Sequence, residues 1–72
     1  MSNKHQFPHS TSISEIEYHP DIKALDITFA SGGRHRHHDV PQDEVDSFKA
    51  ANSPGNYYHL NIRKVYKSSR LD

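Results

Sequence analysis

The chain of 72 residues has no cysteine and no tryptophan. Without cysteine it can form neither a disulfide nor a thiolate metal site. Apolar residues make up only 32% of the sequence, and none of their runs is long enough for a membrane span or a secretory signal. We therefore expect one small cytoplasmic domain with a thin core and no membrane contact. A monomer is the simplest state, with a weak homodimer as the alternative, because such small cores often need additional support.

The charges are unevenly distributed although the net charge is zero. Residues 1–46 carry four basic and eight acidic side chains, a net charge of −4, whereas residues 47–72 carry five basic and one acidic, a net charge of +4. A basic C-terminal segment favours an anionic partner, although such runs are also common on solvated helix faces.

Hydrophobic periodicity predicts a small sheet in the first half of the chain. Residues 1–11 show no period and are predicted to form a flexible tail outside the core, with the domain itself spanning residues 12–67. Alternating apolar side chains predict strands over residues 13–18, 24–30 and 34–40. His-Pro-Asp and Ser-Gly-Gly supply the turns between them. The expected sheet is a three-stranded antiparallel meander.

Two helices are expected after the sheet. Pro41 begins the first, over residues 41–51, and Ser53 is the predicted N-cap of the second, with Pro54 at its first position. The second helix is expected to bury four side chains at helical spacing: Tyr58, Ile62, Val65 and Tyr66. Residues 68–72 lose the period and are predicted to fray. The fold class is thus α+β, in the order β-β-β-α-α.

Three histidines lie within the segment RHRHHD. On a strand, His35 and His37 share one face and could chelate a metal ion, with His59 or Asp39 as a third ligand. The alternative is that both are hydrogen-bonded residues at the edge of the core. Because the chain lacks cysteine and a HExxH motif, we predict no metal and no other cofactor.

The second helix is the best candidate for binding nucleic acid. Lys64 and Lys67 share its exposed side with Tyr57, and further cations are available close by or on the neighbouring strand: Arg63, Arg70, Arg34 and Arg36. Cations for phosphates beside a ring for stacking suit a single strand. Two alternatives remain, a solvated last turn suited to the helix dipole and cross-strand ion pairs that neutralise the arginines.

Catalysis is not expected. The sequence has no glycine-rich phosphate loop, no GxSxG motif and no cysteine nucleophile. So short a chain also offers little volume for a substrate cavity.

The order of motifs resembles the KTSC domain over Ile13 to Tyr66. The matching segments are IxxIxYxP, LDITF, HRHHDVP and AANSPGNYYHLNIRKVY. Where that family carries a central Tyr-x-Tyr, this chain has His35-Arg36-His37, and His59 replaces the asparagine that usually follows the aromatic pair.

The resemblance implies a module like the one at the C-terminus of some lysyl-tRNA synthetases, which also stands alone in bacterial and phage proteins. It implies weak RNA binding, in agreement with the basic second helix. The alternative is a protein-interaction module, such as a small phage or host regulator.

Overall fold

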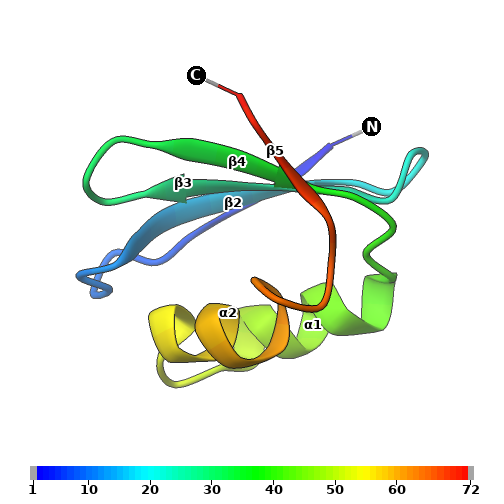
Figure 1. Ribbon diagram of the computed structural model, residues 1–72. Helices are drawn as coiled ribbons and strands as arrows, with labels where there is room; N and C mark the ends of the chain where they lie inside the picture. Colours follow the sequence, from blue (N-terminus) through cyan, green and yellow to red (C-terminus); the bar gives the residue numbers. More distant parts are fainter. Residues whose placement is uncertain (1, 72) are drawn as a thin grey trace.

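The computed structural model describes residues 2–71, in which one face of an antiparallel sheet is covered by two helices (Figure 1). The elements in chain order are β1 (Asn3–Gln6), β2 (Ile13–His19), β3 (Ala24–Phe29), β4 (Arg34–His37), α1 (Gln42–Ala50), α2 (Pro54–Asn61) and β5 (Ser68–Arg70). The strands lie side by side in the same order, β1-β2-β3-β4-β5. The α+β class is confirmed, but the prediction of three strands is wrong because one further strand pairs at each edge.

Strand β1 comes from the segment predicted to be a tail. It pairs with β2, with Asn3 opposite Tyr18 and Gln6 opposite Glu15. Its side chains are mostly exposed and show no pattern, so the ladder rests on backbone hydrogen bonds that any residue can make. Phe7 follows and is only 8% exposed, with its ring stacked on Phe48 at a centroid distance of 5.6 Å. This part of the predicted tail therefore joins the core.

Strand β5 likewise comes from residues predicted to fray. It pairs with β4, with Ser68 opposite His37 and Arg70 opposite His35. The ladder is extended at one end by the Leu71 amide, which donates to the Arg34 carbonyl at 3.1 Å. Backbone N–H and C=O groups at the outer edge of β4 are thereby paired with β5, a strand that the side-chain pattern did not predict.

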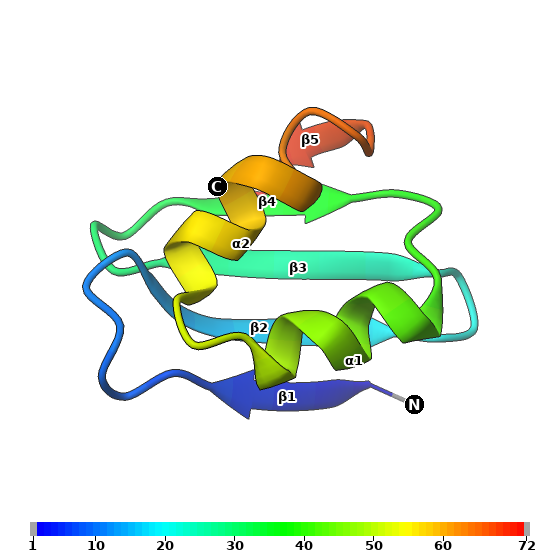
Figure 2. The ribbon, with the colours of Figure 1, turned by 90° about the horizontal axis from the view of Figure 1, so that it is seen from below.

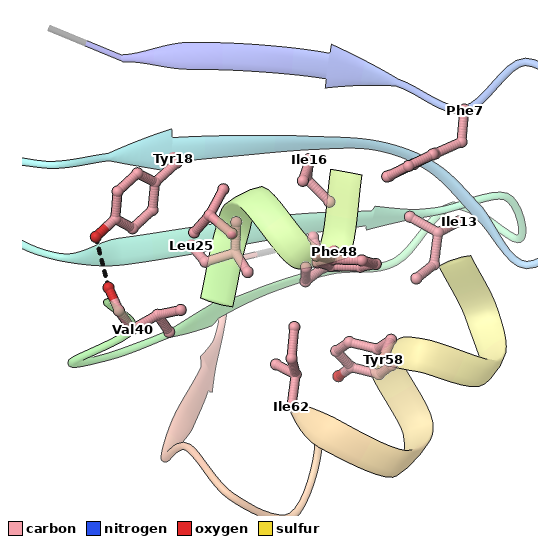
Figure 3. Close-up of a cluster of buried hydrophobic side chains, with 11 residues drawn as sticks. Phe7, Ile13, Ile16, Tyr18, Leu25, Val40, Phe48, Tyr58 and Ile62 are labelled. Atoms are coloured by element: carbon pink, nitrogen blue, oxygen red, sulfur yellow. Dashed lines mark hydrogen bonds between the residues drawn. The ribbon is translucent and has the colours of Figure 1, made fainter. Parts of the chain in front are cut away.

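The core lies between the sheet and the helices (Figure 3). Its fully buried aliphatic side chains come from strands, helices and the segments beside them: Ile13, Ile16, Leu25, Ile27, Val40, Val45 and Ile62. The one hydroxyl shown bonded in this view is that of Tyr18, which donates to the Val40 carbonyl at 2.5 Å. The alternation predicted for β2 and β3 thus places the expected residues inside.

The predicted cap of α2 is confirmed, because the Ser53 hydroxyl accepts from the Asn56 amide at 3.4 Å. The helix ends at Asn61, earlier than the predicted apolar period, and the chain turns toward β5. Val65 is consequently 63% exposed, so its predicted burial is wrong. The third predicted strand is also shorter, ending at His37, and Asp39 beyond it has a left-handed φ of 59°. Within residues 2–71 neither helix has the length and apolarity that crossing a bilayer requires.

Candidate nucleic-acid interface

Strand β4 carries the alternating candidate residues of the sequence analysis. Arg34 and Arg36 lie opposite Thr28 and Asp26 on the open face of the sheet, whereas His35 and His37 alternate with them on the face toward the helices. The two arginines therefore lie on the open face, and the two histidines lie on the face that the helices cover.

Arg36 is bound to a carboxylate on the neighbouring strand. Its Nε donates to Asp26 Oδ1 at 2.7 Å and a terminal nitrogen to Oδ2 at 3.1 Å. Nε2 of His19 lies 2.9 Å from the same Oδ2. Burial would raise the pKa of Asp26, but the hydrogen bonds from Arg36 and His19 outweigh it and hold that pKa below its usual value. The cross-strand ion pair is therefore confirmed for Arg36, and this guanidinium is not free to bind phosphate.

Asp26 also belongs to a group of ligand-type side chains. One atom of each side chain that could bind a metal ion, in Glu17, His19 and Asp26, lies within 4.8 Å of the other two. This is the one such group of three found among residues 2–71. Both Asp26 oxygens already accept hydrogen bonds from Arg36, and one also meets His19. The arrangement is a charge network across β2, β3 and β4.

His37 is enclosed by two tyrosines. Its Nδ1 lies 3.2 Å from the Tyr66 carbonyl, which can only accept, so Nδ1 donates and Nε2 accepts from the Tyr58 hydroxyl at 2.9 Å. Burial lowers the pKa of His37, since the charged imidazolium would be poorly solvated. The alternative of a buried hydrogen-bonded histidine is thus confirmed. With both nitrogens bonded, His37 cannot complete the chelate suggested for His35, His37 and His59.

His35 instead lines a hollow of about 350 Å³ between the end of β3, the start of β4 and α2. We call it the α2 hollow, and its lining includes Ser12, Phe29, His35, Tyr58, His59 and Arg63. Phe29 meets His35 and Tyr58 edge to face, with ring centroids 5.5 and 5.4 Å apart. In the same lining, an Arg63 nitrogen lies 3.4 Å from His59 Nδ1. Side chains predicted for two different roles thus surround one concave site.

Close packing borders this hollow on one side. A Cβ on Gly55 would lie 2.7 Å from Ser12 Cβ and Oγ, so the loop before β2 meets the first turn of α2 directly. Beyond the contact lies a second hollow of about 380 Å³, which includes His5, His9 and Ser53. Ser12, Phe29 and Tyr58 were not predicted as site residues, because they come from a loop, a strand and a helix, and no local pattern shows that these meet.

Tyr57 differs from its prediction. Its ring is only partly exposed and stacks on Phe48 at a centroid distance of 5.4 Å, and its hydroxyl donates to Glu44. Burial, followed by this hydrogen bond, raises the pKa of Tyr57. The expectation of an exposed stacking surface at Tyr57 is wrong, because packing between α1 and α2 takes up one ring face.

The remaining predicted cations are exposed, and they gather at one edge of the molecule. We call this set the basic edge: Arg34, Arg63, Lys64, Lys67 and Arg70. Two ladder contacts bring its parts together, because β5 pairs with β4 and the His38 amide donates to the Lys67 carbonyl at 2.9 Å. Figure 2 shows α2 and β5 beside β4, with α1 and β1 toward the opposite edge. Helix α1 carries three acids, Asp43, Glu44 and Asp46, and one base, Lys49, so its net charge is opposite in sign to that of the basic edge.

Known proteins place this arrangement in a family. Among solved structures, the crystal structure of the KTSC domain protein YPO2434 from Yersinia pestis is similar over 100% of both chains, with a TM-score of 0.91 and 24% sequence identity, a likeness that shows the fold. No curated protein matches the chain. The family model described as KTSC domain matches residues 9–66, which include β2 to β4, both helices and the entire lining of the α2 hollow. The resemblance noted from the motifs is therefore confirmed, and the chain belongs to the KTSC domain family.

Proposed function

We propose that this protein is a non-enzymatic module that binds single-stranded RNA weakly, mainly through phosphates, along the basic edge. The observation that carries the proposal is that strand pairing brings Arg34, from the first half of the chain, to the same sheet edge as Arg70 and the basic segment after α2, with Arg34 on the open face and Arg70 on the face toward the helices. Cations distributed along one edge suit a chain of phosphates. The resemblance to synthetase-linked modules favours RNA over DNA.

Two of the side chains predicted to bind nucleic acid are left out of the proposed site. Arg36 is neutralised by Asp26, and the ring of Tyr57 packs on Phe48. Phosphate contacts would therefore come from the basic edge alone. Because these side chains are exposed, we expect an affinity that depends strongly on salt.

Binding is tested by fluorescence anisotropy with a labelled single-stranded RNA at several salt concentrations. Each phosphate contact contributes a slope of about −0.7 to a plot of log K against log salt for single strands, so three to five contacts predict a slope of about −2 to −3.5. The double variant Arg63→Gln/Lys67→Gln should reduce the magnitude of that slope by about 1.4.

The matched control is Lys23→Asn, which removes a lysine from the β2–β3 turn, away from the basic edge. Lys23 has a φ of 53°, a conformation that asparagine adopts readily. This variant should keep the parental slope. Absence of RNA binding at low salt, or an equal loss in both variants, would contradict the proposal.

A protein partner is the second candidate, because Leu60 and Val65 are 64% and 63% exposed. Such a contact would be apolar and nearly independent of salt. If Leu60→Ser/Val65→Ser abolishes an interaction that salt does not weaken, the protein-interaction function replaces RNA binding.

A further inference from the structure

We infer that the α2 hollow binds a single nucleotide, with its base against the ring lining and its phosphate at Arg63. The inference deepens the proposed function and rests on it, since the nucleotide would belong to the bound strand. A volume of about 350 Å³ is at the small end for ligand sites, which suits one small ligand and excludes a long stretch of strand.

The ring lining supplies the surface for a base. Phe29 is partly exposed at the hollow, and its edge-to-face contacts with His35 and Tyr58 fix its orientation. Tyr58 is held in turn by its hydrogen bond to His37. Aromatic side chains with fixed orientations stack on a base at little cost in conformational entropy. The stacking surface that Tyr57 does not provide is therefore present here.

The exposed rim supplies donors for a phosphate. Arg63, His59 and Ser12 all line the hollow and are exposed. Because Nδ1 of His59 accepts from Arg63, Nε2 of the neutral imidazole carries the proton and is a donor. Among residues 2–71, the side chains that line the hollow include no carboxylate, so this chemistry favours an anion over a metal ion.

The hollow also adjoins the basic edge through His35 and Arg63. His35 lies directly opposite Arg70 in the β4–β5 ladder, and opposed residues present their side chains on the same face of a sheet. Arg63 belongs to both the hollow and the basic edge. A strand whose nucleotide occupies the hollow can thus continue along the phosphate contacts already proposed.

The test is an NMR titration of the labelled protein with uridine 5′-monophosphate, uridine and inorganic phosphate, each to millimolar concentration at low salt. The monophosphate should shift the amides of Ser12, Phe29, His35, His59 and Arg63 together. Uridine and phosphate alone should each bind at least about fivefold more weakly, because each offers only half of the contacts.

Two variants separate the base contact from the phosphate contact. Arg63→Gln should weaken binding of the monophosphate about fivefold or more and should change the affinity for uridine little. Phe29→Leu keeps an apolar side chain and should weaken uridine and the monophosphate alike, by at least about fivefold. Unchanged amide shifts on β1 and α1 would show that Phe29→Leu is folded.

The matched control is Arg34→Gln, on the basic edge but outside the hollow. It should weaken binding of the RNA oligonucleotide but change the affinity for the monophosphate by no more than about twofold. If RNA shifts only the basic edge and the monophosphate shifts nothing, the hollow inference fails and RNA binding stands. If the monophosphate binds in the hollow but RNA does not bind at all, the hollow is a nucleotide site and the proposed function fails.

Discussion

Asp26 and His37 are buried on opposite faces of the sheet, and the two faces accommodate them in opposite ways. On the open face, Asp26 is 3% exposed and stays charged, because Arg36 and His19 compensate it. On the face toward the helices, His37 is 1% exposed and its hydrogen bonds go to the neutral Tyr58 hydroxyl and Tyr66 carbonyl, so burial favours the uncharged imidazole. The hydrogen bonds of both groups are therefore taken up by structural contacts, and neither group belongs to the binding surfaces that we propose.

The largest difference between the faces concerns apolar packing. Ile27 is fully buried toward the helices and Thr28, its neighbour, lies on the open face. We expect Ile27→Ala to lower the free energy of unfolding by about 2–5 kcal/mol, and Thr28→Ala by less than about 0.5 kcal/mol. Urea denaturation followed by circular dichroism measures both, and similar losses would show that the open face is packed as tightly as the core.

The charge network on the open face predicts the next effect. Asp26→Asn keeps the shape of the side chain but leaves Arg36 and His19 without their counter-charge, at a cost of about 1–3 kcal/mol of unfolding free energy. Glu17→Gln on the same face is the control and should cost less, since Glu17 remains partly exposed. Equal losses in chemical denaturation would mean that Asp26 has no special role.

Acid should weaken the helix-covered face through His37. Because the pKa of His37 is lowered in the folded state, the unfolded chain takes up a proton more readily. Stability is then complete above about pH 6.5 and falls below it by up to about 1.4 kcal/mol per pH unit.

His37→Gln removes this titration while keeping polar atoms near Tyr58 and the Tyr66 carbonyl. The groups around this site in the parent protein are His35 and His38 on the same segment and the two tyrosines. Thermal unfolding between pH 5 and 8, a range chosen about the histidine pKa, should show a flatter profile for the variant. Identical slopes would assign the acid sensitivity to other histidines.

The smallest effect on stability separates two arginines on one strand face. Arg34→Gln should change the unfolding free energy by less than about 0.5 kcal/mol yet lower the affinity for RNA, because Arg34 is exposed on the basic edge. Arg36→Gln should do the reverse, costing stability and leaving RNA affinity nearly unchanged, since Asp26 already occupies that guanidinium. Paired denaturation and anisotropy measurements decide, and an equal loss of RNA affinity in both variants would break the comparison.

How far the sequence predicts the site depends on the residue. Alternation identified the face of each β4 side chain, and the cap at Ser53 located the start of α2. The same pattern could not distinguish Arg34 from Arg36, because the counter-ion of Arg36 lies on β3 and its position is set by the hairpin register. The α2 hollow could not be predicted either, since its residues come from the loop before β2, from three strands, from α2 and from the segment after it.

The sequence by itself determined the α+β class, the central strands β2 and β3 and the separation of charge along the chain, since these follow from local periodicity and residue counts. Only the tertiary structure decided that β1 and β5 exist, because short polar strands are held by backbone hydrogen bonds to a neighbour rather than by their side chains. It also decided which cations remain exposed. That choice depends on which charges long-range strand pairing and helix packing bring within a few ångströms of one another, and no local pattern encodes those distances.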